Sequence, residues 1–288
     1  MILIVDSGAT KADWICIDKN SNVLFSTQTL GLNPHYLSSS IINERIVNNF
    51  EIYQNRNNVS HLYFYGAGCG VDSSVQRMKK AFQKIFTKAK FIIKEDTYAA
   101  VYSVADFDEP SIVCILGTGS NCTYFDGKEI EQRVTSLGYL IMDQASGNYF
   151  GKELLRAYYF NKMGKELSIK FEQEFNINPD VVKENIYRKD NPPGYLAGFA
   201  KFLIQNRSDK KIQAIMNKGF QIFIENQILQ FSDAKEIPIH FIGSIAFYLR
   251  EELKVILKKN RLNLGRVIKQ PIDGLVDYHK KMIEADSN

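Results

Sequence analysis

Short apolar runs separated by turn residues dominate the N-terminal part of the chain. β-Branched and aromatic residues bounded by Gly, Asn, Asp and Lys predict strands at residues 2–5, 13–18, 23–29, 61–65 and 91–94. Apolar residues at helical spacing predict helices over residues 36–53, 73–86 and 96–104. This alternation of strands and helices is typical of an α/β domain.

The same order of elements begins again at Ser111. An apolar strand, Ile112–Leu116, runs into the Gly-rich turn Gly117–Asn121, and another strand follows at Cys122–Phe125. The turn at residues 7–10 then aligns with the turn at residues 118–121, and the two halves match element for element. Because internal duplication is a fold-level signal, we expect two related α/β domains around a central cleft, with a boundary near residues 106–110.

The remaining pattern is mostly helical. It predicts helices at residues 147–160, 179–187, 194–205, 209–231 and 245–258, and one strand at residues 239–242. No low-complexity linker interrupts it.

Composition narrows the functional classes. The chain has 288 residues, which favours two domains, and a net charge of +4 carried by dispersed lysines. We therefore expect no nucleic-acid partner. No apolar run approaches the roughly 20 residues of a membrane span, and the strand before Asp6 does not resemble a signal peptide. These observations predict a cytoplasmic protein with no membrane partner, and they leave homodimerisation open.

The four cysteines form no Cys-x-x-Cys pair and have no accompanying histidine cluster. We therefore expect buried, reduced thiols rather than a zinc or iron–sulfur site.

The first turn is a candidate phosphate site. It comprises Ser7, Gly8, Ala9, Thr10 and Lys11 between two strands. Successive backbone N–H groups in such a turn can bind phosphate oxygens, and Asp6 at the strand end is suited to hold Mg²⁺ through water. A plain hairpin turn is the alternative.

A second candidate turn contains Gly117, Thr118 and Gly119, and the strand–turn–helix segment at residues 241–246 adds Gly243 and Ser244. A glycine there lets a flat base lie against the backbone. The first turn and the second turn both lack the Walker spacing and the dinucleotide fingerprint, and neither of these two turns leads directly into a helix. Two small-residue turns in duplicated positions favour a phosphate-binding role over two ordinary hairpins.

Three polar residues complete the candidate chemistry. Asp96 stands at a strand-to-helix junction, where it serves either as a helix cap or as the base that accepts a hydroxyl proton during phosphoryl transfer. Asn33, before a proline, is suited to bind sugar hydroxyls or to form a turn. Asp143 lies in a small-residue loop and offers the same choice between a ligand contact and a cap.

These segments together resemble the N-acetylglucosamine kinase family, within the wider group that includes the reductase-activating ATPases. The resemblance covers most of the chain and rests on DSGATK (6–11), GLNP (31–34), EDTYAA (95–100), LGTGSNC (116–122), MDQASG (142–147) and FIGSIA (241–246). It implies two ribonuclease-H-like domains of the actin-like ATPase type, one formed by residues 1–106 with 271–288 and the other by residues 107–270. A C-terminal helix at about residues 273–284 would return to the first domain.

The resemblance also implies the activity and the roles of residues. It implies ATP and Mg²⁺ as cofactors and the phosphorylation of an amino sugar, N-acetylglucosamine to its 6-phosphate. Asp96 would be the catalytic base and both turns would bind ATP phosphates. Asn33, Thr118, Asn121 and Asp143 would contact the sugar, and Gly243 with Ser244 would lie at the adenosine. The loop at residues 66–70 and Gln144 depart from the family pattern, which leaves N-acetylmuramate or glucosamine as alternative substrates.

Two rival functions share this fold. One is an ATPase that activates a partner redox enzyme through a bridging iron–sulfur cluster, for which Cys69 and Cys122 would be the ligands by position. The other is a non-catalytic sugar-responsive regulator.

Overall fold

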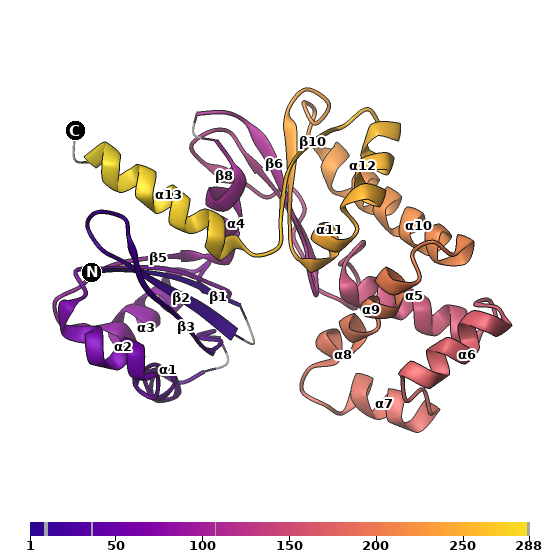
Figure 1. Cartoon of the computed structure of the whole chain (residues 1–288), viewed down its shortest axis with the longest axis horizontal. Helices are drawn as coiled ribbons and strands as arrows, with labels where there is room; N and C mark the ends of the chain where they lie inside the picture. The colour runs from indigo at the N-terminus through magenta and orange to yellow at the C-terminus, as the bar shows by residue number, and fades with distance from the viewer. Residues whose placement is uncertain (9–10, 36, 107, 287–288) are drawn as a thin grey trace. The chain divides into compact units, whose positions relative to one another are not determined.

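The structure is a computed structural model that describes residues 1–8, 11–35, 37–106 and 108–286. The chain divides into two compact units (Figure 1). Unit 1 comprises Met1–Val104 together with Gln270–Asn288, and unit 2 comprises Ala105–Lys269. Unit 1 is therefore built from both ends of the chain.

A five-stranded mixed sheet forms the centre of unit 1. Its strands are β1 (Ile2–Ser7), β2 (Lys11–Ile17), β3 (Val23–Leu30), β4 (His61–Gly66) and β5 (Lys90–Glu95). They lie in the order β3-β2-β1-β4-β5. The β1–β2 and β2–β3 pairs are antiparallel, whereas β4 pairs parallel with both β1 and β5.

Strand alternation divides the core of unit 1 into two layers. Leu3 and Val5 of β1 belong to a cluster that includes buried residues of the helices on one side of the sheet. Ile2 and Ile4 point to the other face, as the two-residue period of a strand requires, and join a cluster with residues of the helices there. The helices of the first cluster are α1 (Ser39–Val47), α2 (Phe50–Asn55) and α3 (Asp72–Gln83), and those of the second are α4 (Asp96–Val104) and α13 (Pro271–Asp286).

Unit 2 repeats this sheet. Its strands are β6 (Ser111–Leu116), β7 (Ser120–Phe125), β8 (Ile130–Glu131), β9 (Pro238–Ile242) and β10 (Asn263–Ile268). They lie in the order β10-β9-β6-β7-β8, with the antiparallel and parallel pairs in the same places as in unit 1. This duplication confirms the predicted fold class of two ribonuclease-H-like α/β domains.

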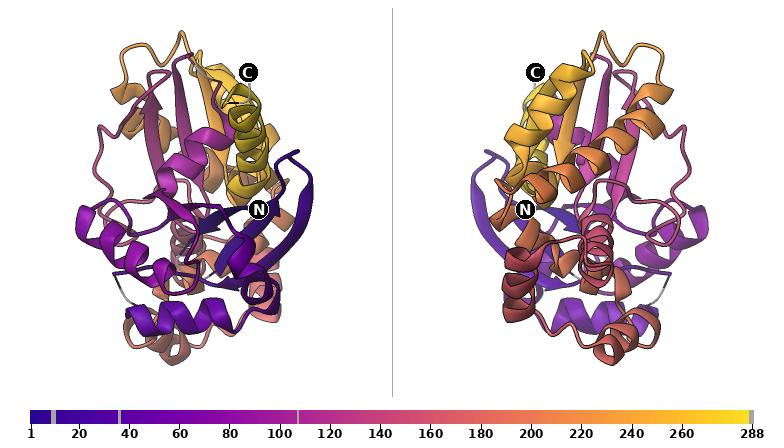
Figure 2. Two further views of the ribbon diagram at one scale, coloured as in Figure 1. Left: turned by 90° about the vertical axis from the view of Figure 1, so that its left-hand side faces the viewer. Right: turned by 90° about the vertical axis from the view of Figure 1, so that its right-hand side faces the viewer.

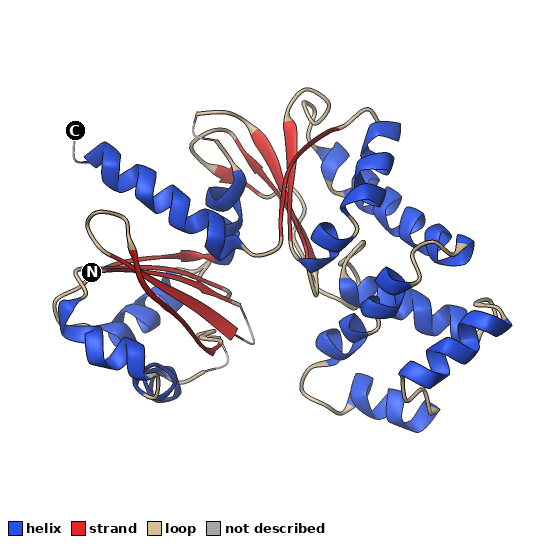
Figure 3. Cartoon of the chain, viewed as in Figure 1, coloured by secondary structure: helices blue, strands red, loops and turns tan. Residues whose placement is uncertain are grey.

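Helices form most of the rest of unit 2 (Figure 3). They are α5 (Gly147–Tyr159), α6 (Lys165–Glu174), α7 (Pro179–Tyr187), α8 (Pro192–Gly198), α9 (Ala200–Gln205), α10 (Lys210–Asn226), α11 (Ser244–Tyr248) and α12 (Arg250–Lys259). One continuous cluster of buried residues joins these helices to the sheet, and Phe150, Phe171 and Phe220 are among its largest members.

Several element boundaries differ from the prediction. The helix predicted over residues 36–53 is two helices, because Asn49 leaves the helical conformation and its side chain accepts the Ile52 amide to cap α2. The helix predicted over residues 194–205 begins earlier, at Pro192, and divides after Gly198. The long helix predicted to end at residue 231 ends at Asn226. Strand β10 and helix α6 were not predicted.

In the part of the chain that the structure describes, no helix has both the length and the apolar character needed to cross a membrane. All four cysteines are free and buried.

A buried histidine attaches α13 to the sheet of unit 1. His279 has no exposed surface, and its Nε2 lies 3.1 Å from the Tyr65 hydroxyl of β4. The ring of Tyr63 packs against it at a centroid distance of 4.2 Å. Figure 2 shows α13 as a single long helix whose start lies beside α4, and a Cβ on Gly274 would overlap the Ser103 carbonyl. Close helix packing and one hydrogen bond therefore hold the C-terminal helix in place.

Burial lowers the pKa of His279 from its ordinary 6.5 to about 3. The unfolded chain therefore binds the proton more tightly than the folded chain. The stability contributed by the neutral imidazole is present above pH 6.5 and is lost as the pH falls toward 3.

We expect His279→Gln to remove this pH dependence. Between pH 7 and pH 5 the unfolding free energy of the wild-type protein should fall by about 2 kcal/mol relative to that of the variant. Urea unfolding at both pH values measures this difference. Tyr65→Phe is the matched control, because it removes the hydrogen bond and keeps the titrating ring. An identical pH dependence in wild type and His279→Gln would contradict the assignment.

Candidate active site

The first group of candidate residues lies at one edge of the sheet of unit 1. Strands β1, β4 and β5 are parallel neighbours, so their carboxyl ends meet at the same edge. Asp6 is near the end of β1, and Asp96 is the first residue of α4, directly after β5. The sheet order alone brings these two carboxylates together, although 90 positions separate them in the sequence.

Burial and the charges of neighbouring carboxylates raise the pKa of both Asp6 and Asp96. Burial, followed by the charges of Asp96 and Asp13, raises the pKa of Asp6 to about 7, and Lys11 only partly opposes this. Burial, followed by the charge of Glu95, raises the pKa of Asp96 to about 6, while the backbone amides of Thr97 and Asp96 itself lower it. Asp96 thus accepts backbone hydrogen bonds at the start of α4, and its pKa nevertheless stays near 6.

A divalent cation fits this edge. Asp6 is a half-buried carboxylate with other carboxylates around it and one opposing lysine, and a bound cation would relieve the repulsion between these carboxylates. Among the described residues no group of three or more His, Cys, Asp or Glu side chains could hold a metal by itself. Mg²⁺ that keeps several of its waters needs few protein ligands.

The first turn is connected to the loops that follow it. The Ser7 hydroxyl accepts the Leu32 amide at 3.0 Å, and the Ser7 carbonyl accepts the Ala67 amide at 2.9 Å. Asn33 is buried, its side-chain oxygen accepts the His35 amide at 2.9 Å, and a Cβ on Gly68 would lie 2.5 Å from that oxygen. The turn, the Asn33 loop and the loop after β4 therefore form one packed surface.

The rest of the first turn is only partly assigned. The Lys11 amine pairs with Asp13 at 2.9 Å. Among the described residues, a Cβ on Gly8 would meet only the Lys11 carbonyl, at 3.8 Å. Ala9 and Thr10 lie outside the described residues.

In unit 2 the second turn caps a helix. The first amides of α5 lack partners within the helix. The Gly117 carbonyl accepts the Gly147 amide at 2.8 Å, and the Thr118 carbonyl accepts the Asn148 amide at 3.0 Å. The turn is closed by a hydrogen bond of 3.0 Å from the Gly117 amide to the Gly119 carbonyl. The turn and the helix thus fix each other's position.

Asn148 connects this turn to Asp143. Its side-chain nitrogen donates to the Thr118 carbonyl and to Asp143 Oδ2, both at 2.7 Å, and the side chain is fully buried. Two acceptors at the nitrogen fix the orientation of the amide, and its Oδ1 is buried without a partner in the structure. Asp143 has a left-handed backbone (φ 67°), and a Cβ on Gly119 would lie 2.8 Å from its Oδ2. Glycine at residue 119 therefore leaves room for the Asp143 carboxylate beside the second turn.

Asn121 is held separately. Its side-chain oxygen accepts the Cys122 amide at 2.6 Å and the Gln132 side chain at 2.8 Å. Among the described residues no hydrogen bond joins it to Asp143 or Thr118.

A pocket of about 530 Å³ opens beside the second turn. Gly117, Thr118 and Ser244 line it, and its walls are mostly small or apolar residues, namely Gly147, Ala197, Gly198, Ala200, Ile204, Ile245 and Tyr248, with Lys201 and Gln205. Gly243 immediately precedes Ser244 and has φ +117°, and a Cβ on Gly243 would overlap the Leu116 carbonyl. The size and apolar lining of the pocket are those of a small-molecule site.

Comparison with solved structures shows which proteins the chain is similar to. A protein from Porphyromonas gingivalis, provisionally described as an N-acetylglucosamine kinase, is 34% identical and superposes with a TM-score of 0.90, covering 98% of this chain and 99% of that one. A similarly described protein from Chromobacterium violaceum is 16% identical, with a TM-score of 0.69 over 96% and 98% of the chains. A ROK-family glucokinase from Streptomyces griseus, solved with glucose and AMPPNP, is 13% identical, with a TM-score of 0.56 over 96% and 97%.

The last two likenesses establish the fold alone. The first, at 34% identity over nearly the whole chain, shows that the protein belongs to the N-acetylglucosamine kinase family, whose fold is that of the sugar kinases and actin-like ATPases. The sequence matches no protein-family model and none of the curated proteins with which it was compared.

Sequence reasoning missed Asn148 and the pocket wall from α8 and α9. The small residues around Gly198 indicate a pocket only once the fold is known to place them and Thr118 in the lining of the same cavity. Asn148 follows Ser146, a good helix cap, so its position at the start of α5 could be inferred but not its two partners.

We expect Asn148→Ala to destabilise unit 2 strongly. It leaves Asp143 Oδ2 without its donor, at a cost of about 1–3 kcal/mol for a buried group. It also removes the side-chain bond to the Thr118 carbonyl, which keeps only its bond from the backbone amide of residue 148. Urea unfolding measures the loss. Asn185→Ala is the control, because among the described residues the Asn185 side chain donates only to the Val181 carbonyl, one helical turn away. It should cost within about 0.5 kcal/mol. Equal effects of the two substitutions would argue against a special role for Asn148.

Proposed function

We propose that the protein is an ATP-dependent kinase that phosphorylates a hydroxyl of an amino sugar, N-acetylglucosamine at its 6-hydroxyl being the first candidate. The observation that carries the proposal is the pocket of unit 2, where Gly117 and Thr118 of the second turn meet Ser244 after β9. A phosphate-binding turn beside an apolar slot of this size suits a nucleotide better than a free sugar.

Asp96 is the proposed catalytic base. As a sugar hydroxyl attacks the γ-phosphorus of ATP, the new oxygen–phosphorus bond forms and the bond to ADP breaks. The hydroxyl proton passes to the Asp96 carboxylate and then to solvent. A pKa of about 6 leaves Asp96 mostly ionised at neutral pH and more basic than an ordinary aspartate, which suits a general base.

Asp6 is the proposed carboxylate for Mg²⁺, held through water. The ion neutralises phosphate charge when it is bound. Ser7, Gly8, Ala9, Thr10 and Lys11 in unit 1, with Gly117, Thr118 and Gly119 in unit 2, are the proposed phosphate contacts, and Gly243 with Ser244 the proposed adenosine contacts.

Sugar recognition is assigned to Asn33, Thr118, Asn121 and Asp143. The Asn33 side-chain nitrogen has no partner among the described residues, and Asp143 uses only Oδ2 toward Asn148. Each therefore keeps a polar atom for a sugar hydroxyl. The P. gingivalis relative, provisionally described as an N-acetylglucosamine kinase, supports an amino sugar over other acceptors.

A coupled assay of ADP release tests the proposal. Purified protein with Mg-ATP should release ADP at least tenfold faster with one of N-acetylglucosamine, N-acetylmannosamine, N-acetylmuramate or glucosamine than without sugar, because hydrolysis is suppressed until the acceptor is bound. An ATPase that activates a redox partner would release ADP with no dependence on sugar. A regulator would bind sugar and release none.

Asp96→Asn separates the base from a helix cap. The amide keeps the size of the side chain and much of its capping ability but cannot take a proton, so kcat should fall by roughly 10²–10⁴. KM values should change much less, and thermal unfolding should stay close to that of the wild type. A folded Asp96→Asn protein with the wild-type kcat would remove Asp96 from the mechanism.

The nucleotide pocket is tested by filling it. Gly198 lines the pocket, and no atom of the described residues outside its own helix lies within 4 Å of a Cβ placed there, so a side chain can begin at this position without a clash. We expect Gly198→Trp to weaken Mg-ATP binding at least tenfold in calorimetry, because the indole occupies space that the base needs. Gly198→Ala is the control and should bind as the wild type does. Unchanged affinity in Gly198→Trp would place the nucleotide elsewhere.

A further inference from the structure

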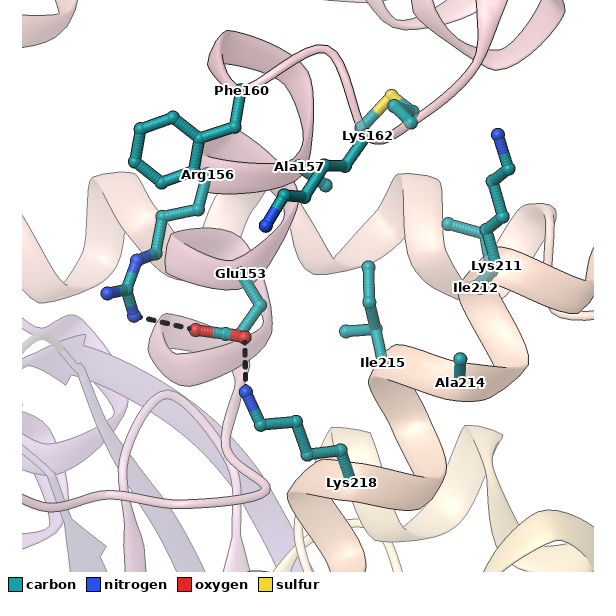
Figure 4. Close-up of a pocket in the computed structure, with 11 residues that line it drawn as sticks. Glu153, Arg156, Ala157, Phe160, Lys162, Lys211, Ile212, Ala214, Ile215 and Lys218 are labelled. Atoms are coloured by element: carbon teal, nitrogen blue, oxygen red, sulfur yellow. Dashed lines mark hydrogen bonds and ion pairs between the residues drawn. The ribbon is translucent and has the colours of Figure 1, made fainter.

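A second pocket lies in unit 2, away from the second turn and Ser244. It has a volume of about 490 Å³ and lies between the later turns of α5, the residues that follow them, and α10 (Figure 4). None of its lining residues belongs to the candidate active site.

This pocket carries an excess of positive charge. Arg156, Lys162, Lys211 and Lys218 line it, and Glu153 is the only acidic residue among the described residues of its lining. Glu153 is shared between two of the cations, at 3.0 Å from Arg156 and 3.3 Å from Lys218. In the described part of the chain no ion pair joins Lys162 or Lys211 to a carboxylate. In Figure 4 the Lys162 amine points into the space between α5 and α10, on the side of Glu153.

The wall beneath these charges is apolar. Met163 and Ile212 are buried and belong to the core of unit 2, and Ile215 lines the α10 side. An ordinary solvated lysine face has no such concave floor. A ligand that fits must therefore combine negative charge with a nonpolar part.

The segment that carries Lys162 is fixed by its backbone. The amides of Lys162 and Met163 both donate to the Ala157 carbonyl, at 2.7 and 3.0 Å, and Asn161 has a left-handed backbone with φ 55°. Gly164 follows with φ 88°, and a Cβ there would overlap the Lys211 amine. The Lys162 segment is thus held against α5 rather than hanging free, and the Lys211 amine lies against the backbone of Gly164.

We propose that this pocket binds a phosphate monoester of a small organic molecule. Such a group carries nearly two negative charges at neutral pH and three acceptor oxygens, which match the unpaired amines of Lys162 and Lys211, and its organic part would lie on Ile215. The site is separate from the proposed kinase reaction. The second pocket and the candidate active site share α5. Asn148 lies in the first turn of this helix, and Glu153 and Arg156 lie about one to two turns later.

Calorimetry with phenyl phosphate tests this proposal. We expect saturable one-to-one binding with a dissociation constant below about 1 mM, and at least tenfold weaker binding of benzyl alcohol, which lacks the charge. Lys162→Glu should weaken phenyl phosphate at least tenfold. Lys170→Glu makes the same change of charge on the exposed face of α6 and should have no effect. Lys162→Gln repeats the test if Lys162→Glu does not fold.

The nucleotide pocket is excluded by a further variant. Gly198→Trp fills that pocket and should leave phenyl phosphate binding unchanged, so this result does not depend on whether the protein is a kinase. Four outcomes would overturn the proposal: no binding to the wild type, equal binding of benzyl alcohol, loss of binding in Gly198→Trp or Lys170→Glu, or unchanged affinity in a folded Lys162 variant.

Discussion

The parallel pairing at the centre of each sheet is the constraint on which the candidate site depends. In unit 1, β4 must lie between β1 and β5, so the ends of β1 and β5 meet at one edge and bring Asp6 toward Asp96. In unit 2, the parallel pair of β6 and β9 places the second turn beside Gly243, where even a Cβ would overlap the neighbouring strand. Chemical groups far apart in the sequence become neighbours because the backbone hydrogen bonds between parallel strands fix where each strand ends.

The carboxylates at the edge of unit 1 lower the stability of the folded protein near neutral pH. A carboxyl group whose folded pKa lies above its unfolded value binds its proton more tightly when folded, so Asp6 and Asp96 reduce stability as the pH rises from about 4 to 7. His279 acts in the opposite direction over the same range. The histidine attaches a helix, whereas burial disfavours the ionised forms of Asp6 and Asp96. Perturbed groups of this kind cluster at functional sites.

The sequence allows the duplicated fold and most strands to be predicted, because apolar runs and turn residues are local signals. It does not reveal β10, whose residues Asn263, Gly265 and Arg266 make a polar, half-exposed strand. The first and second turns, Asp96 and Ser244 are recognisable from motifs. Asn148 is not, because its role lies in two hydrogen bonds to residues 30 and five positions away, and those depend on the docking of the turn onto α5. The chain's pattern gives elements and motifs; the partners of a buried amide follow only from packing.

The division of unit 1 between the two ends of the chain has a consequence for biosynthesis. Helix α13, together with α4, covers the face of the sheet formed by Ile2, Ile4 and Tyr65, and it leaves the ribosome only after all of unit 2. Until then the part of that apolar face that α13 covers stays exposed while the whole of unit 2 is being made. A nascent chain, or one cut short before residue 270, would present this surface to chaperones and proteases. Quality control of unit 1 therefore depends on α13, which is far in sequence from the carboxylates that the same sheet supports.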